Sequence, residues 1–214
     1  MPKFRTFWDI FNGYIQRRMI FILIIVLVFA IGTGFGALTV KTLSTNQKED
    51  LSNYLHSIFT SVPEEIHSLN RAELAHQGMV DNIVKTTGLM WLLGLSVIGS
   101  PFILALVFLR GFVLGFTIGF LVEDLVLRGV FLTLLSILPH NLIIVPAIII
   151  GATASLSFSF AALKTLIGLN NENIYHQFFG CAIMVIFSWC LLGLGALVET
   201  FLTPILIEFG NRFL

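Results

Sequence analysis

Charge is scarce in this sequence: only 11% of its 214 residues are Asp, Glu, Lys or Arg, while 57% are apolar. Neither sign is in excess, since 12 basic residues balance 12 acidic ones, so there is no general basic surface for nucleic acid. A soluble core of this size cannot bury so much apolar surface. With a mean hydropathy of +0.95, the composition predicts an integral membrane protein surrounded by membrane lipid.

The sequence also lacks the motifs of the common membrane and phosphate-using enzymes. It contains no HExxH pair, no GxGD aspartyl motif, no nucleophile elbow and no GxxxxGK[ST] phosphate loop. Cys181 and Cys190 lie nine residues apart in one apolar run, which fits neither a disulfide framework nor a CxxC pair. We therefore expect a protein that is not an enzyme, with no catalytic residues and no cofactor.

Two residue groups could suggest chemistry, and their spacing argues against it. The histidines at 56, 67 and 76 are 11 and 9 residues apart, so they do not share a helical face at metal-ligand spacing, and we expect no metal site. Three serines of one apolar run could be paired with His140 as in rhomboid-like proteases, but hydroxylated residues in membrane helices usually serve packing. These serines are Ser155, Ser157 and Ser159.

The hydrophobic runs predict an all-α fold with about five transmembrane helices, because a bilayer core of about 30 Å needs about 20 apolar helical residues. Pro101 divides one long run, since proline suits the first turn of a helix and disrupts an interior. The segment Val130–Leu138 is too short to cross, and we expect a half-helix joined at Pro139 to a span that is broken at a Pro-His turn. The expected spans are 19–40, 83–100, 101–122, 142–163 and 178–198.

The polar segments predict how these helices are arranged in the membrane. Residues 1–18 carry apolar residues at spacings of three and four with basic residues at the ends, which predicts a cytoplasmic amphipathic helix lying in the interface. Basic residues before the first span, 19–40, favour a cytoplasmic N-terminus. Five crossings then place the C-terminus outside, with an extracytoplasmic helical segment at 41–82 and a membrane domain at 83–214.

The extracytoplasmic segment contains an apolar stripe at helical spacing. Asn46 and Glu49 at its start resemble a capping box. Two interpretations stay open: the helix rests on the outer leaflet, or its stripe binds a partner protein. We call these residues the docking stripe: Leu51, Tyr54, Leu55, Ile58 and Phe59.

Glycines at four-residue spacing predict close helix contacts. A glycine repeated every fourth residue lies on one helical face and lets another helix approach closely. The sequence leaves open whether this contact lies within one chain or between chains, and with it whether the chain forms a homo-oligomer. The glycines are Gly32, Gly36, Gly111, Gly115 and Gly119.

The stretch "LPHNLIIVPAIIIGA", residues 138–152, sets polar and helix-breaking residues into an apolar run. One interpretation is a proton-sensing or ion-handling site, as in a small transporter or channel. The other is that His140 and Asn141 satisfy backbone groups freed by the prolines. The residues of this predicted membrane polar site are Arg110, Pro139, His140, Asn141 and Pro146.

Four stretches together carry a family resemblance: "GTGFGA", "QKEDLSNYL", "RGFVLGFTIGF" and "LPHNLIIVPAIIIGA". With these motifs the chain resembles stage II sporulation protein M over nearly its whole length. The most specific element is Pro139-His140 followed by Pro146-Ala147-Ile148. Two positions depart from the family pattern, because Ile144 stands where an acidic residue is expected and Arg110 where asparagine is often found.

The resemblance implies a role that composition cannot show. It implies a non-enzymatic membrane anchor and recruitment subunit of a peptidoglycan-degrading complex needed for forespore engulfment. Its expected partners are two cell-wall-degrading sporulation proteins that face the extracytoplasmic side. Its expected location is the cell membrane, at the septal and engulfing membrane during sporulation.

Overall fold

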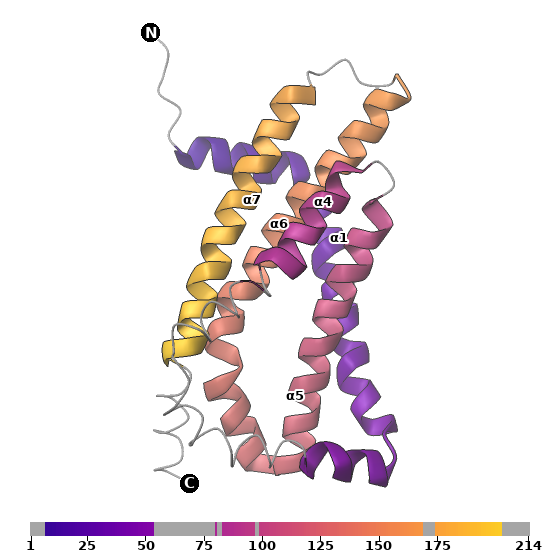
Figure 1. Cartoon of the computed structure of the whole chain (residues 1–214), viewed down its shortest axis with the longest axis vertical. Coiled ribbons are helices and arrows are strands. Elements are labelled where there is room, and N and C mark those ends of the chain that lie inside the picture. Colours follow the sequence, from indigo (N-terminus) through magenta and orange to yellow (C-terminus); the bar gives the residue numbers. More distant parts are fainter. Residues whose placement is uncertain (1–6, 54–79, 81–82, 97–98, 169–173, 203–214) are drawn as a thin grey trace.

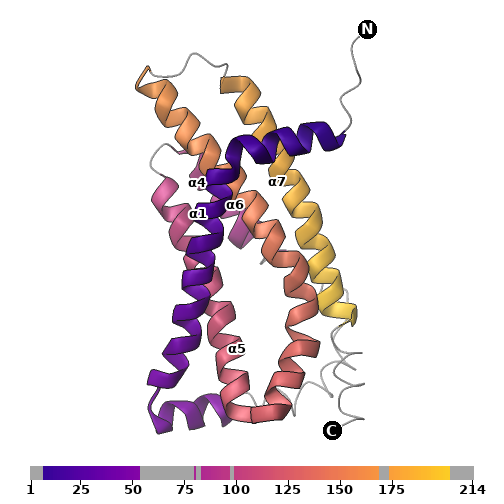
Figure 2. The same cartoon turned by 180° about the vertical axis from the view of Figure 1, so that it is seen from behind.

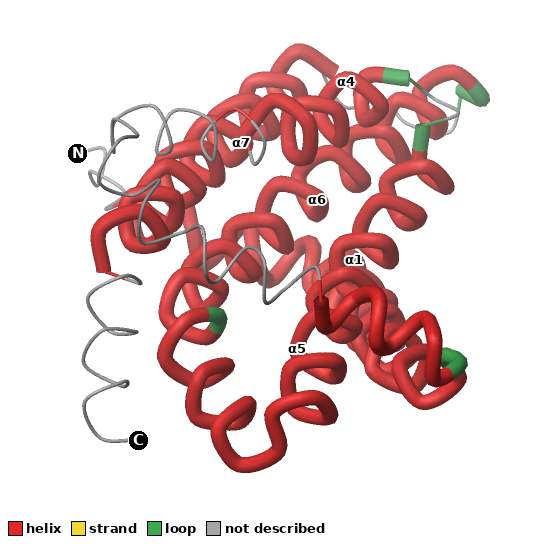
Figure 3. The backbone as a smooth tube through the Cα atoms, turned by 60° about the horizontal axis from the view of Figure 1, so that its bottom comes forward, coloured by secondary structure: helices red, strands yellow, loops and turns green. Residues whose placement is uncertain are grey.

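The described part of the chain is built from helices. The computed structural model describes residues 7–53, 80, 83–96, 99–168 and 174–202, and these contain no strand (Figure 3). The predicted fold class is confirmed: this is an all-α polytopic membrane protein. In chain order the elements are α1 (Phe7–Thr42), η1 (Ile83–Gly88), α4 (Leu89–Leu95), α5 (Ser100–Ser136), α6 (Leu138–Leu166), α7 (Ile174–Leu197) and η2 (Val198–Leu202) (Figure 1).

Four helical segments of the described residues are long and apolar enough to cross a membrane. The shortest has 24 residues. At the usual rise it measures about 36 Å, more than the roughly 30 Å of a hydrocarbon core. These segments overlap four of the five predicted spans and are Arg18–Thr42, Ser100–Glu123, Leu138–Leu166 and Gln177–Phe201.

The second predicted span, 83–100, is wrong in length. Its described helix consists of the 6 π-helical residues of η1 and the 7 α-helical residues of α4, at most about 20 Å of helix. The chain leaves the helix at Ser96, where ψ is 134°. Since the apolar run continues through this point to α5, hydrophobicity alone could not locate the break.

Helices α1 and α5 run parallel. Gly32 of α1 faces the backbone of Phe108 on α5, and Gly36, one turn later, faces that of Phe112. The chain between these helices must therefore return to the end where α1 begins. The described part of this return is η1 with α4, which lies against α6, as both views of the bundle show (Figures 1 and 2).

The first turns of α1 lie across one end of the bundle, and the rest of the helix descends through it (Figures 1 and 2). One continuous helix, Phe7–Thr42, thus combines the segments predicted at 1–18 and 19–40. Its membrane-crossing part begins at Arg18, and residues 1–6 lie outside the described residues. The transverse start is the arrangement that an interfacial helix requires.

A short helix follows α1 and is held at the end of the bundle where α1 and the α5 span finish. The Ser44 hydroxyl lies 3.1 Å from Gln47 Oε1, which also accepts from the Ser44 backbone N–H at 3.1 Å. The capping box is therefore Ser44 with Gln47, and the predicted Asn46 with Glu49 is wrong. Lys48 forms a 2.5 Å ion pair with Glu123, which joins this helix to α5.

The break before α6 does not lie where the prolines predict it. The chain turns at Ile137, Pro139 sits in the first turn of α6, and the helix continues through Pro146. The predicted break at a Pro-His turn is wrong, because a first-turn proline lacks only an N–H that has no helical acceptor there. The expected half-helix Val130–Leu138 is also wrong: its residues up to Ser136 end α5, whose last turns bend toward α6 (Figures 1 and 2).

The predicted orientation can be checked by labelling single cysteines. The short helix containing Asn53 and the α6 C-terminus near Ile167 lie at opposite ends of the bundle (Figure 1). In a chain with Cys181 and Cys190 replaced by alanine, we expect an impermeant thiol reagent on intact protoplasts to label Asn53→Cys and spare Ile167→Cys. Permeabilised protoplasts, which expose both positions, are the control. Labelling of Ile167→Cys alone in intact protoplasts would show that the orientation is the opposite of the predicted one.

Candidate functional site

The predicted glycines form the contact between α1 and α5. A Cβ placed on Gly115 would overlap the carbonyl oxygen of Thr33, and one on Gly119 would lie 3.1 Å from the Cα of Ala37. Both neighbours are backbone atoms, which cannot rotate away. Within the described residues the glycine contact is thus made inside one chain. We name it the glycine seam: Gly32, Gly36, Gly111, Gly115 and Gly119.

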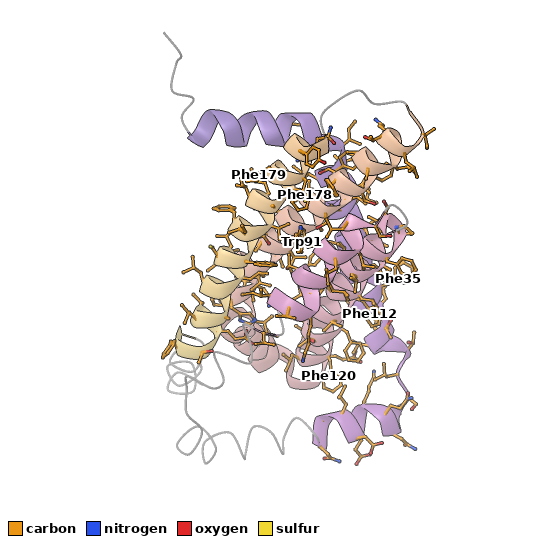
Figure 4. All side chains as sticks on the ribbon, turned by 45° about the horizontal axis from the view of Figure 1, so that its top comes forward. Phe35, Trp91, Phe112, Phe120, Phe178 and Phe179 are labelled. Atoms are coloured by element: carbon orange, nitrogen blue, oxygen red, sulfur yellow. The ribbon has the colours of Figure 1, made fainter. Side chains whose placement is uncertain are left out.

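A ladder of aromatic rings runs along α5 beside the glycine seam. Phe108, Phe112, Phe116 and Phe120 follow at four-residue intervals, with successive ring centroids 6.3–6.4 Å apart. Figure 4 shows Phe112 and Phe120 one after the other along α5. Phe35 of α1 packs on Phe108 with centroids 6.2 Å apart. The ladder and the glycines together align the two parallel helices.

A cavity of about 350 Å³ lies between α1, α5, α6 and η2. Three predicted polar residues line it: Arg110 from α5, and His140 and Asn141 from the first turn of α6. Pro139 and Pro146, also predicted, are not among its described lining residues; Pro139 is half-buried and Pro146 is exposed.

Thr117 and Glu199 complete the polar lining of this cavity. Sequence reasoning missed both. Thr117 could have been found, because it follows Arg110 by seven residues and two helical turns place it on the same face. Glu199 could not, because it belongs to η2 and reaches the cavity only through the packing of α7 on α6. Ile144, at the position where the resemblance leads us to expect an acidic residue, lines the cavity too.

The side chains of His140 and Asn141 form a hydrogen bond with each other in the first turn of α6. Asn141 Nδ2 donates to the Ile137 carbonyl at 2.9 Å and lies 3.0 Å from His140 Nε2. Since an amide nitrogen only donates, Nε2 accepts, and the ring proton is on Nδ1. That Nδ1 is buried with no hydrogen-bond partner among the described residues. Asn141 thus satisfies a backbone carbonyl at the turn, whereas the histidine bonds to Asn141.

Arg110 connects the cavity to the short return helix. Its guanidinium donates to the hydroxyl of Thr86 in η1. Thr86 and its neighbour Thr87 are both buried. A charged side chain within a membrane span is costly unless it has polar partners, so this contact helps to explain how the arginine is accommodated on α5.

The three serines of α6 are buried packing residues. Ser159 donates to the carbonyl of Ser96 at 2.9 Å and lies 2.8 Å from the Ser100 hydroxyl, which fixes the connection between α4 and α5. Ser155 packs against Gly94. It is fifteen residues, or about 22 Å of helix, from His140, so these two do not form a catalytic pair.

The remaining predicted site residues lie largely outside the described residues. Of the docking stripe, Leu51 is half-buried on the short helix after α1, whereas Tyr54, Leu55, Ile58 and Phe59 fall in the segment that is not described. The histidines at 56, 67 and 76 fall there as well. Within the described ranges, no group of three or more His, Cys, Asp or Glu side chains could hold a metal ion.

Comparison with known proteins decides the family. A family model described as stage II sporulation protein M matches residues 25–204. The chain belongs to the stage II sporulation protein M family. The match includes the cavity, the glycine seam and the described return helix. No curated protein and no solved structure matches the chain. Membership in the stage II sporulation protein M family makes this a sporulation-related membrane protein, in a family that is generally non-catalytic.

Proposed function

We propose that the chain is the non-enzymatic membrane anchor that recruits two extracytoplasmic cell-wall-degrading proteins to the septal and engulfing membrane during sporulation. The observation that carries this proposal is the family match over residues 25–204. In this role the protein binds other proteins and positions them, and the chemistry on the cell wall belongs to the partners.

The arrangement of the described helices supports an anchoring role. Four apolar spans fix the chain in the bilayer. The short helix that begins the docking stripe is joined to the end of the α5 span by the pair of Lys48 and Glu123. With a cytoplasmic N-terminus this end faces the cell wall. A partner on that side therefore meets Leu51, the first residue of the docking stripe, close to the membrane surface.

A second candidate function, transport, has one specific observation in its favour. The cavity of about 350 Å³ is lined by charged and polar side chains inside an apolar bundle, and such residues within membrane spans often mark a pathway for ions or small solutes. A transporter would need Arg110 and His140 for its cycle, whereas an anchor needs them only for stability.

The double variant Arg110→Gln, His140→Asn separates these functions. We expect it to accumulate at a reduced level and still to recruit a fluorescently tagged partner to the septum, since neither residue belongs to the docking stripe. Partner fluorescence is scored in cells matched for the level of the variant. Arg110→Lys, which keeps the cation and leaves His140 in place, is the control. If engulfment stops at matched protein level while the partner stays at the septum, transport through the cavity is the better account.

A further inference from the structure

The described walls of the cavity between α1, α5, α6 and η2 are mostly aliphatic, and one side of the cavity is open at membrane depth. Val113 of α5 lines the cavity and is 57% exposed. It lies ten residues, or about 15 Å of helix, from Glu123 at the end of the α5 span. This depth is within the hydrocarbon core. Among the described residues, the open side therefore lies at the level of lipid chains.

The polar groups at the outer end of the cavity are left with hydrogen-bond acceptors. The Thr117 hydroxyl donates to the Val113 carbonyl at 2.9 Å, so its lone pairs remain. The Asn141 amide nitrogen is engaged with the Ile137 carbonyl and the neighbouring histidine ring, which leaves Oδ1 as the acceptor. Glu199, which is exposed, adds the oxygens of its carboxylate.

The donors among the lining residues are engaged or enclosed. The Arg110 guanidinium donates to Thr86 of η1, so we assign it no part in binding a ligand. The Nδ1 of His140 is buried, so a ligand does not reach its proton in this arrangement. Arg110 and Glu199 still place opposite charges on the walls, and an ion of either sign would meet a like charge. These walls therefore suit an uncharged ligand that supplies a hydrogen-bond donor.

The acceptors lie just inside the outer boundary of the hydrocarbon core. Thr117 is six residues, or about 9 Å of helix, from Glu123. Asn141 lies at a similar depth, because Gly195, which packs beside the first turn of α6, is six residues from Phe201 at the end of the α7 span. A centred span of 24 residues extends about 3 Å beyond a core of about 30 Å at each end. Both acceptors are thus about 6 Å inside the boundary, deeper than a phosphate head group.

We propose that this cavity binds an acylglycerol, a neutral lipid whose head group is a hydroxyl. The hydroxyl donates among Thr117, Asn141 and Glu199, and an acyl chain lies along the aliphatic wall of α6 and leaves the cavity on the open side. The volume of about 350 Å³ lies in the range of small-molecule pockets, about 300–1,000 Å³. This inference does not depend on the recruitment of partners.

The hydroxyl, and not the chain, makes the site selective. A bilayer surrounds an acyl chain with apolar groups as the cavity does, so moving the chain from lipid into the cavity has no hydrophobic driving force. One hydrogen bond between neutral groups changes affinity by about 2- to 10-fold. We therefore expect the cavity to prefer an acylglycerol over the same lipid with its hydroxyl blocked.

The test compares three probes on the full chain purified in detergent: dioleoylglycerol, the acetyl ester of its hydroxyl, and free glycerol at the same concentration. Native mass spectrometry counts the bound lipids, and Tm is measured with each probe. We expect dioleoylglycerol to bind about 2- to 10-fold more tightly than its acetyl ester and to raise Tm more, while glycerol has no effect. Equal binding of the two lipids, or a rise in Tm with glycerol equal to that with dioleoylglycerol, would overturn the proposal.

The double variant Thr117→Val, Glu199→Leu removes two of the acceptors at exposed positions and leaves Asn141 to hold the turn before α6. We expect it to lose most of the preference for dioleoylglycerol over the acetyl ester. The matched control is Thr39→Val, Glu49→Leu. Thr39 donates to a carbonyl one turn earlier, as Thr117 does, and neither control residue lines the cavity. Tm without lipid checks that both variants fold, and an equal preference in the two would show that the acylglycerol binds elsewhere.

Discussion

Replacing Gly115 with alanine is expected to remove most of the folded protein from the membrane. The new methyl group would overlap the carbonyl oxygen of Thr33, a backbone atom of α1 that no change of rotamer can move. The two helices would have to separate along the glycine seam and lose their packing. Overpacking at such a contact costs about 1–3 kcal/mol and sometimes more, and a loss of about 1–2 kcal/mol already changes the abundance of a protein in cells several-fold.

Gly34→Ala, on the partner helix α1, is the control, because no atom lies within 4 Å of a Cβ at that position. Alanine is favoured over glycine in a helix by roughly 1 kcal/mol, so this variant should accumulate as the native chain does or better. Immunoblots of membrane fractions and thermal unfolding in detergent measure both variants. Equal accumulation of Gly115→Ala and Gly34→Ala would show that α1 and α5 do not pack through these glycines.

The glycine seam illustrates what a sequence pattern can predict. Four-residue spacing predicts that the glycines share a face, and the structure places all of them against another backbone. The spacing does not predict which helix they meet, because any close helix satisfies it. That α1 meets α5 in a parallel pair follows from the path of the chain between them, and no local pattern encodes this path.

The wrong prediction for the span 83–100 and the wrong prediction of a break at Pro139 have a common physical cause. Hydropathy counts apolar residues, and the run through residues 83–122 stays apolar where the helix ends at Ser96. A proline in an apolar run predicts a helix break at Pro139, although the first turn of a helix accepts proline without losing a backbone hydrogen bond. In both cases the boundary depends on tertiary contacts. Near the first boundary, Ser159 of α6 bonds to Ser96, which supports the chain where it leaves the helix.

The residues that line the cavity also differ in how far the sequence predicts them: some stand out locally, and others are found only from tertiary packing. Arg110 and His140 are visible in the sequence because a charged or titratable side chain is conspicuous in an apolar run. Glu199 is not, since it follows the last apolar turns of α7 and looks like an ordinary helix end. Its place beside the first turn of α6 depends on the packing of Gly195 against Ile144, a contact between residues 51 positions apart.

Charged substitutions in the docking stripe are expected to abolish recruitment while the protein itself persists. The double variant Leu55→Glu, Phe59→Glu places two carboxylates on the face that we propose for the partners. Burying a polar group without a hydrogen bond costs about 2–7 kcal/mol, enough to lower affinity by several orders of magnitude. The four spans do not involve these positions, so insertion and accumulation should be unchanged.

The measurements are the level of the variant in membranes, the septal fluorescence of a tagged partner and the completion of engulfment. Asn53→Glu is the matched control, because it adds a carboxylate at an exposed position between Leu51 and Tyr54 that is not one of the stripe residues. We expect dispersed partner fluorescence and arrested engulfment for the double variant, and normal localisation for the control.

Aromatic replacements separate docking from a helix that only rests on the leaflet. Leu55→Phe with Phe59→Trp keeps the stripe apolar and changes its shape. Lipid accepts any apolar side chain, so a membrane-resting helix would keep recruitment intact, whereas a protein interface needs complementary shapes and should lose part of it. If recruitment survives both the aromatic and the glutamate pairs, the partners dock elsewhere, and the rim of the cavity around His140 becomes the next surface to substitute.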